Sequence, residues 1–171
     1  RKPKEHSFYI TVCLLRAKSR GRVTLRSARP EDAPRIALNL FSAAEDFQTL
    51  RNGLRAARAI YGTKPQSDLI DAETIPGGHL QSDEEIDQAI REFGGITHHP
   101  VGTCAMGIGP LSVVDPQLRV RGLSGLRVAD ASVMPLIPGA NTNAATVMIA
   151  EKAADLILGR IAPRVASKSA N

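Results

Sequence analysis

Residues 138–152 read PGANTNAATVMIAEK, and this stretch decides how the end of the 171-residue chain folds. Its second half is rich in Ala and other apolar helix formers, and Gly159 follows the last apolar residues, so a helix is expected over Asn143–Leu158. The first two turns of that helix carry almost no polar side chains. Its free backbone N–H groups would therefore favour negative charge, unless Thr142 or Asn143 simply caps the helix.

Two more helices are predicted upstream. Between residues 42 and 61, apolar side chains recur at intervals of three and four residues and form one stripe, made of Phe47, Leu50, Leu54, Ala57 and Tyr61. The sequence SDEE at residues 82–85 has the pattern of a capping box between Ser82 and Glu85. The short helix that follows would end before Gly94 and bury Ile86, Ile90 and Phe93. Residues 63–81 contain two prolines and a Gly-Gly pair, and they are predicted to form a loop.

The remaining regular structure is expected to be strand. Residues 7–16 (SFYITVCLLR) are β-branched and apolar, which is typical of a buried strand, and residues 22–27 (RVTLRS) alternate as in a half-solvated strand. A short connection that contains glycine joins them, so an antiparallel pair is predicted. Shorter strand-like pieces occupy residues 112–114, 118–120 and 126–128. Together with the helices, these strands predict an α+β fold, an antiparallel sheet with flanking helices.

The composition is that of a globular protein, with 43% hydrophobic and 23% charged residues and a formal charge of +5. The basic residues are spread along the chain and aromatic residues make up only 4%, so a solvated surface is favoured over a nucleic-acid interface. No apolar run is long enough to span a membrane. The two cysteines, Cys13 and Cys104, form no Cys-x-x-Cys pair, and a reducing cytoplasmic setting is expected.

A histidine pair stands in residues 98–107 (HHPVGTCAMG). The proline that follows holds the backbone of His99 in the extended region, so its ring projects from a stiff stem, and Gly102 permits a close approach to a neighbouring backbone. A single histidine of this kind is also commonly a structural residue. A zinc site of His98, His99 and Cys104 is not expected, because adjacent side chains on an extended stem point to opposite faces.

A second candidate lies in residues 113–135 (VVDPQLRVRGLSGLRVADASVMP), where a predicted strand ends at Asp130 and is followed by the small Ala131 and Ser132. In open α/β sheets, ligands bind beyond the carboxyl ends of strands, and an acidic residue with small neighbours can approach the ribose or diphosphate of a cofactor there. The local pattern alone favours the alternative, a turn that Asp130 caps.

In this order, HPVGTCAMG, VVDPQLRVRGLSGLRVADASVMP and PGANTNAATVMIAEKAADLI resemble the C-terminal region of the glucose–methanol–choline (GMC) oxidoreductases, and they are most similar to the choline-dehydrogenase-like branch. The similarity covers residues 16–159, because SRGRVTLRSARPEDAPRIALN also resembles the family's substrate-domain strand and loop. The resemblance implies an FAD-dependent dehydrogenase or oxidase that acts on an alcohol. It implies that His99 is the catalytic histidine, that Asn143 is the second active-site residue, and that the cofactor lies against Asp130, Ala131, Asn143 and Ala144.

The implied chemistry needs these residue types. Oxidation of an alcohol removes a hydride from carbon and a proton from the hydroxyl, and a histidine accepts a proton near neutral pH. General-base help of this kind contributes roughly 10²–10⁴-fold in rate. The Asn143 amide cannot take the proton, but it can hydrogen-bond the alcohol oxygen.

The resemblance also implies a division of the chain. Residues 5–111 would belong to a substrate-binding domain that carries the His99 loop, and residues 112–160 to an FAD-binding domain. Residues 161–171 contain Pro163 and a Ser/Lys-rich end, and this composition predicts a flexible tail. The family's strand–GxGxxG–helix unit is absent from this sequence, because its glycine pairs do not fit that spacing. The chain is therefore expected to act with a missing N-terminal FAD-binding region and to be inactive alone. The alternative is a folded, non-catalytic fragment or binding module.

Overall fold

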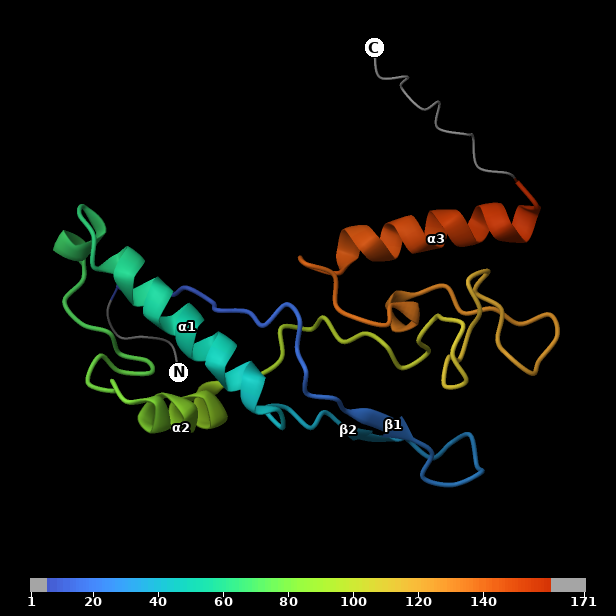
Figure 1. Ribbon diagram of the computed structural model, residues 1–171, viewed down its shortest axis with the longest axis horizontal. Coiled ribbons are helices and arrows are strands. Elements are labelled where there is room, and N and C mark those ends of the chain that lie inside the picture. Colours follow the sequence, from blue (N-terminus) through green and yellow to red (C-terminus); the bar gives the residue numbers. More distant parts are fainter. Residues whose placement is uncertain (1–5, 161–171) are drawn as a thin grey trace, which may run out of the picture. The chain divides into compact units, whose positions relative to one another are not determined.

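The computed structural model describes residues 6–160, which divide into two compact units between Thr97 and His98. Within these residues, the first unit contains an antiparallel pair of strands and three helices: β1 (Arg22–Thr24), β2 (Arg35–Ala37), α1 (Ala44–Tyr61), the 3₁₀-helix η1 (Gln66–Leu69) and α2 (Asp83–Phe93). The second unit contains the 3₁₀-helix η2 (Ala131–Val133) and α3 (Asn143–Leu158) (Figure 1). The predicted α+β class is confirmed, whereas the tail expected over residues 161–171 lies outside the described residues.

β1 pairs with β2 in a short antiparallel ribbon. The sequence predicted instead that β1 pairs with a buried strand over residues 7–16, and this prediction is wrong. Residues 7–16 form no strand, and Tyr9 is 89% exposed. This segment contacts α1 instead: the Phe8 ring meets the Tyr61 ring edge-on, with 5.2 Å between the ring centroids. A strand needs a hydrogen-bonding neighbour, and the side chains of a helix do not supply one.

α1 follows the predicted apolar stripe, with Phe47 and Ala57 buried. Its start is held by Asp46, which is 1% exposed. The Asp46 carboxylate accepts hydrogen bonds from the backbone N–H groups of Lys18 and Ser19, at 2.7 and 2.8 Å, and from the Ser19 hydroxyl. Burial acts to raise the pKa of Asp46, but these hydrogen bonds outweigh burial and hold the pKa below its usual value.

α2 begins with the predicted capping box. The Glu85 N–H donates to the Ser82 hydroxyl oxygen at 3.2 Å, and the Ser82 N–H donates to the Glu85 carboxylate at 3.0 Å. Ile86 and Ala89 form its buried face, whereas Phe93 is 52% exposed, so the prediction that Phe93 is buried is wrong. Burial depends on what packs against each turn of a helix, and the spacing in the sequence does not specify this.

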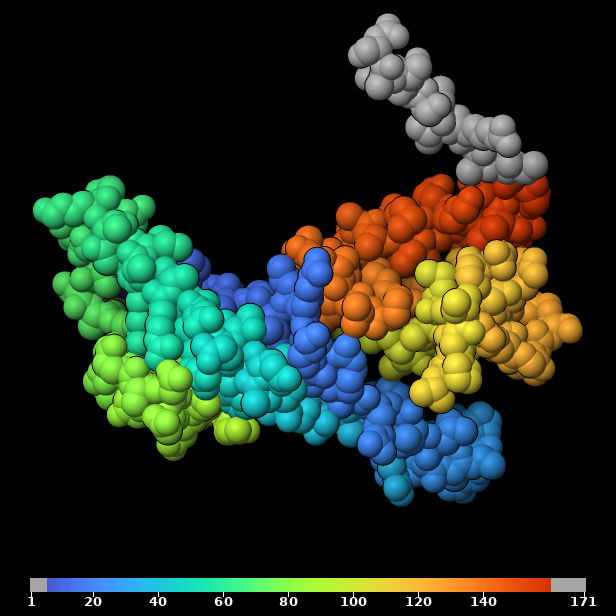
Figure 2. Space-filling view, in the orientation of Figure 1, coloured from blue at the N-terminus to red at the C-terminus, as the bar shows by residue number. Residues whose placement is uncertain are grey.

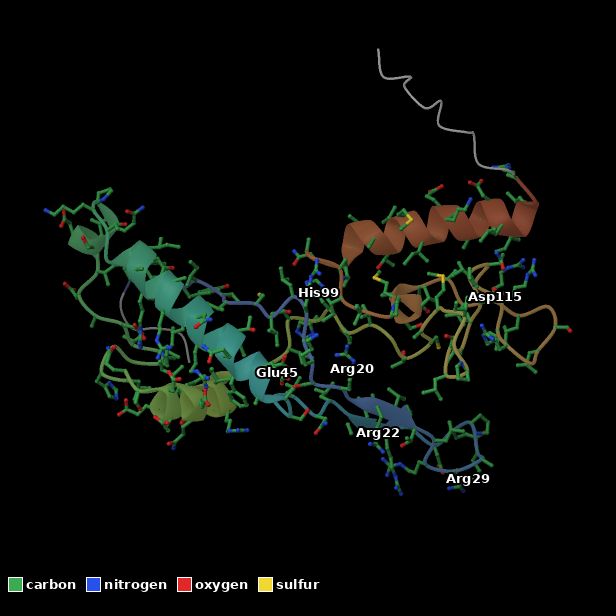
Figure 3. The ribbon with its side chains drawn as sticks, viewed as in Figure 1. Arg20, Arg22, Arg29, Glu45, His99 and Asp115 are labelled. Atoms are coloured by element: carbon green, nitrogen blue, oxygen red, sulfur yellow. The ribbon has the colours of Figure 1, made fainter. Side chains whose placement is uncertain are left out.

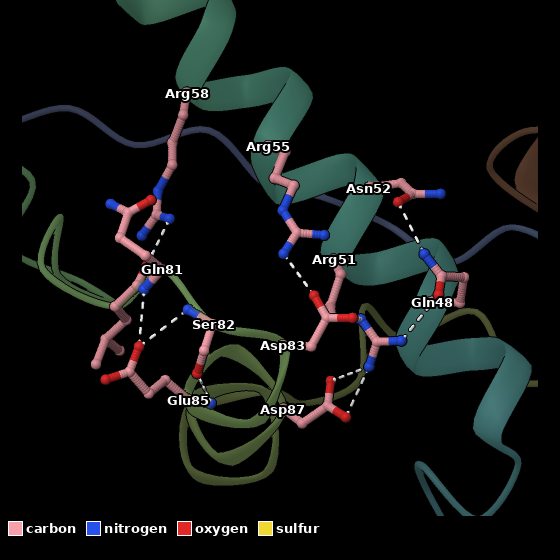
Figure 4. A network of polar contacts seen from close by, with 11 residues as sticks. Gln48, Arg51, Asn52, Arg55, Arg58, Gln81, Ser82, Asp83, Glu85 and Asp87 are labelled. Atoms are coloured by element: carbon pink, nitrogen blue, oxygen red, sulfur yellow. Dashed lines mark hydrogen bonds and ion pairs between the residues drawn. The ribbon is translucent and has the colours of Figure 1, made fainter.

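Ion pairs join α1 to α2 (Figure 4). The Arg51 Nη1 atom lies 2.6 Å from the Asp87 carboxylate, and Arg55 pairs with Asp83 at the start of α2. Farther along α1, the Arg58 guanidinium donates two hydrogen bonds, at 2.8 and 2.9 Å, to the Glu73 carboxylate. Glu73 lies in the predicted loop of residues 63–81, which contains only the short η1 as helix. The Arg58 bonds lower the pKa of Glu73 below its usual value.

The second unit is built around one hydrophobic core, to which α3 and the preceding loops contribute Val114, Leu118, Val133, Met134, Ile149 and Ala153. α3 has the predicted bounds and is followed by Gly159 at φ 66°. The three predicted strand pieces between residues 112 and 128 form isolated bridges instead of strands. Figure 2 shows the atoms of α3 (orange to red) lying along these loops (yellow to orange). No helix within residues 6–160 is both long and apolar enough to cross a membrane.

Candidate active site

The chain bends immediately before the predicted catalytic histidine. His98 has φ 59°, in the left-handed region that favours glycine, and the proline after His99 restricts His99 to extended backbone. His98 is exposed and His99 is partly buried, so the adjacent rings lie in different surroundings. Within residues 6–160, no group of three or more His, Cys, Asp and Glu side chains could hold a metal ion.

The loop that follows His99 is fixed against η2 by backbone hydrogen bonds. The N–H groups of Gly102 and Cys104 both donate to the Ser132 carbonyl, at 3.1 and 3.0 Å. Two residues farther on, the Met106 N–H donates to the Val133 carbonyl at 2.8 Å. Gly102 has φ 93°, which a residue with a side chain rarely adopts. The close backbone approach predicted at Gly102 is therefore made to η2.

Asp130 and Ala131 lie at the start of η2. The Asp130 carboxylate accepts a hydrogen bond from the Ser132 N–H at 2.8 Å, so Asp130 caps this short helix. Asp130 is exposed, and Ala131 is partly buried. The local sequence pattern favoured this capping role for Asp130 over a contact with a cofactor. Because Ser132 also accepts the hydrogen bonds from the His99 loop, η2 joins the Asp130–Ala131 pair to that loop.

Thr142 and Asn143 mark the start of α3. Thr142 occupies the N-cap position, but its side chain makes no capping bond, so the alternative in which Thr142 simply caps the helix does not hold. Its hydroxyl oxygen instead lies 2.9 Å from the Nδ1 atom of His99. Figure 3 shows His99 beside the beginning of α3. A helix without a side-chain cap leaves backbone N–H groups free in its first turn, at a typical cost of about 1 kcal/mol.

This hydrogen bond brings two of the predicted site segments together. His99 meets Thr142, the residue before Asn143, and Asn143 and Ala144 are exposed at the helix start. The sequence pattern did not identify Thr142 as the partner of His99. The only sequence signal was a small hydroxyl residue next to Asn143, and that signal is shared by ordinary helix caps.

The arrangement suits proton transfer beside an electron-rich ligand. With Nδ1 of His99 bonded to Thr142, Nε2 is the remaining nitrogen that can exchange a proton. The uncapped start of α3 presents backbone N–H groups and the positive end of the helix dipole. Exposed Asn143 adds an amide that can both donate and accept hydrogen bonds. These groups fit a flavin, whose ring gains negative charge on reduction.

Comparison with known proteins gives one consistent result. The family model described as GMC oxidoreductase matches residues 17–150. An oxygen-dependent choline dehydrogenase from Brucella ovis is 46% identical over 159 residues, which cover 92% of this chain and 29% of that protein. An alcohol dehydrogenase [acceptor] from Pseudomonas putida is 45% identical over 156 residues, which cover 91% of this chain and 28% of that protein.

A solved structure is similar over the same region. The FAD-dependent oxidoreductase from Chaetomium thermophilum superposes with a TM-score of 0.79 at 34% sequence identity, covering 85% of this chain and 25% of that protein. The chain thus spans 28–29% of the length of the two curated relatives named above.

Proposed function

Because the chain belongs to the GMC oxidoreductase family, we propose that it carries the catalytic base and part of the cofactor site of an FAD-dependent enzyme that oxidises an alcohol. The observation that supports this most is the contact between His99 and Thr142, because it draws the predicted base to the predicted cofactor segment. The relatives named above are a choline dehydrogenase and an alcohol dehydrogenase, so we propose an alcohol of this class as the substrate.

His99 is the proposed general base. The proton of the alcohol hydroxyl moves to Nε2 of His99, because Nδ1 is already bonded to Thr142. When FAD is bound, it supplies the acceptor for the hydride that leaves the alcohol carbon. For catalysis of this type, loss of the general base lowers the reaction rate roughly 10²–10⁴-fold.

Asn143 is the proposed orienting residue. It is the first residue of α3 and is exposed, so its side chain is accessible to a substrate. Its amide N–H can donate a hydrogen bond to the alcohol oxygen, which fixes the reacting carbon without taking the proton. Because this bond strengthens as negative charge builds on the oxygen, Asn143 also lowers the energy of the transition state.

The cofactor side is proposed to consist of Asp130, Ala131, Asn143 and Ala144, together with the backbone N–H groups at the start of α3. Asp130 caps η2, Ala131 begins it, and Asn143 and Ala144 lie in the first turn of α3; η2 and α3 contribute to one core. The helix start favours negative charge, and the small side chains of Ala131 and Ala144 allow a close approach of a ligand.

We propose further that residues 5–111 form part of a substrate-binding domain and residues 112–160 part of an FAD-binding domain. The rest of the FAD site would come from further sequence in a longer protein or from a second chain. Cys13 and Cys104 are free thiols, which is compatible with the cytoplasmic setting that we propose.

The test uses the full-length holoenzyme and anaerobic flavin reduction by choline and by a series of primary alcohols. His99→Ala should slow flavin reduction roughly 10²–10⁴-fold. His98→Ala is the matched control, because His98 is the adjacent exposed histidine and has no proposed role. An unchanged rate in His99→Ala, or an equal loss in both variants, would remove His99 from the mechanism and favour a non-catalytic role for this region.

A further inference from the structure

We propose that Thr142 is a positioning residue for His99: its hydroxyl oxygen accepts the Nδ1–H of the imidazole and so keeps Nε2 free to take the alcohol proton. This inference rests on the proposed function of His99. It starts from the 2.9 Å separation between His99 Nδ1 and Thr142 Oγ1.

Thr142 is placed for this contact and not for helix capping. It is 8% exposed, and a buried hydroxyl needs a hydrogen-bond partner. A threonine at the N-cap ordinarily has extended backbone and accepts from a backbone N–H two or three residues later. Thr142 instead has φ −76° and ψ −15°, a helical conformation, and its side chain makes no capping bond. Its hydroxyl is therefore available to His99.

The two side chains are held by segments that are 43 residues apart in the sequence. On one side, Gly102 and Cys104 bind the His99 loop to the Ser132 carbonyl of η2. On the other side, Ile149 anchors α3 in the same core as Val133 of η2. Because both segments are fixed to η2, the distance between the ring and the hydroxyl does not depend on a single flexible loop.

The direction of the hydrogen bond follows from the chemistry of a base. A neutral imidazole has one N–H and one nitrogen lone pair. Since Nδ1 contacts Thr142, Nε2 can accept the alcohol proton only in the tautomer that has its hydrogen on Nδ1. After transfer, the imidazolium carries hydrogen on both nitrogens. A Thr142 oxygen that accepts the Nδ1–H can keep this hydrogen bond both in the neutral imidazole and in the imidazolium. If the Thr142 hydroxyl instead donated to Nδ1, the direction of the hydrogen bond would have to reverse when the ring took up the proton.

The first readout is the tautomer of His99, measured by ¹⁵N NMR in the full-length holoenzyme labelled at histidine. The His99 signals are identified by their absence in His99→Ala. We expect the Nδ1–H tautomer in the wild type. The Nε2–H tautomer would overturn the proposal. The tautomer itself is read from the wild-type protein, and His99→Ala serves only to assign the signals.

The second readout compares three variants at matched FAD content. Thr142→Val removes the hydroxyl but keeps the shape of the side chain. In this variant His99 should lose its preference for the Nδ1–H tautomer, and flavin reduction at saturating alcohol should slow about tenfold, as for one lost hydrogen bond. Thr142→Ser keeps the hydroxyl and should return the rate to within about twofold of the wild type. Thr146→Val is the control, because the Thr146 hydroxyl donates to the Thr142 carbonyl at 2.9 Å and not to His99. It should leave the tautomer unchanged.

The outcomes separate this inference from the proposed function. If His99→Ala stops flavin reduction while Thr142→Val keeps the wild-type tautomer and rate, the inference about Thr142 is overturned alone. If His99→Ala keeps the wild-type rate, the proposed function fails, and the tautomer measurement still decides whether Thr142 orients the ring. A loss in Thr142→Val that Thr142→Ser does not rescue also contradicts a role for the hydroxyl.

Discussion

Replacing Asp46 by Asn should loosen the attachment of residues 18–19 to α1 with little change in side-chain size. One carboxylate oxygen accepts the Lys18 N–H at 2.7 Å, and the other accepts the Ser19 N–H at 2.8 Å together with the Ser19 hydroxyl. An asparagine offers one oxygen and one NH₂ group in their place. One backbone N–H must therefore face another donor, at a residue that is only 1% exposed.

The expected cost follows from these contacts. A hydrogen bond to a charged group contributes about 1.5–3 kcal/mol, and an unsatisfied buried donor costs about 1–3 kcal/mol. Because the two figures count some of the same atoms, we expect about 2–4 kcal/mol in total for Asp46→Asn. At about 1.4 kcal/mol per factor of ten, this raises the opening equilibrium of the segment about 30- to 700-fold.

Native-state hydrogen exchange of the full-length protein measures that opening directly. The amides of Lys18 and Ser19 should exchange faster by this factor in Asp46→Asn. Asp32→Asn is the control, because Asp32 pairs with Arg29, whose side chain is 76% exposed, and such a pair contributes about 0–1 kcal/mol. Unchanged protection at Lys18 and Ser19 in Asp46→Asn would refute the reasoning.

The same contacts set a pH dependence. The pKa of Asp46 is lower in the folded state than in the unfolded chain, so its carboxylate stabilises the fold above the unfolded pKa of about 3.9. That contribution is lost as the pH falls through the lower, folded pKa. The difference in protection between wild type and Asp46→Asn should therefore be full at neutral pH and shrink below about pH 4. A difference that stays constant through this range would contradict the assignment.

Two further variants test packing and backbone strain. Ile86→Ala removes a side chain that is 0% exposed and should lower the free energy of unfolding by about 2–5 kcal/mol, measured by thermal or urea unfolding, whereas Phe93→Ala, at a 52% exposed side chain, should cost clearly less. Equal costs would contradict the burial pattern of α2. Gly102→Ala places a side chain at φ 93° and should cost about 1 kcal/mol or more and slow flavin reduction by displacing His99. Gly95→Ala is the control, because an added Cβ there would meet nothing within 4 Å, and an equal melting temperature in both variants would refute the strain argument.

The predictions that the structure confirms depend on contacts within a few residues. The capping box of Ser82 and Glu85 closes over three residues, and both hydrogen bonds are present. α3 begins at Asn143 and ends before Gly159, as the run of helix formers and the glycine predicted. The motifs around His99, Asp130 and Asn143 also indicated the GMC oxidoreductase family to which the chain belongs, because a family signature is carried by the order of residues and does not depend on tertiary structure.

Long-range partners were not predictable in the same way. Residues 7–16 have the composition of a strand, yet the sheet position beside β1 belongs to β2. Phe93 continues the apolar spacing of α2, yet it is exposed. In both cases, the local pattern indicates that a segment can be buried or can pair as a strand. Tertiary packing decides whether the burial or the pairing takes place.

The sequence by itself determined the α-helices α1, α2 and α3, the capping box of α2, the glycine that ends α3, the α+β class and the family. Propensity, capping and motif order all act over short stretches of chain. Only the tertiary structure decided that the hydroxyl of Thr142 meets His99, 43 residues away, and does not cap α3. The hydroxyl of a threonine at a helix start can either cap the helix or form a hydrogen bond with a distant side chain. Which of the two bonds forms depends on whether folding brings another acceptor or donor within about 3 Å of the hydroxyl.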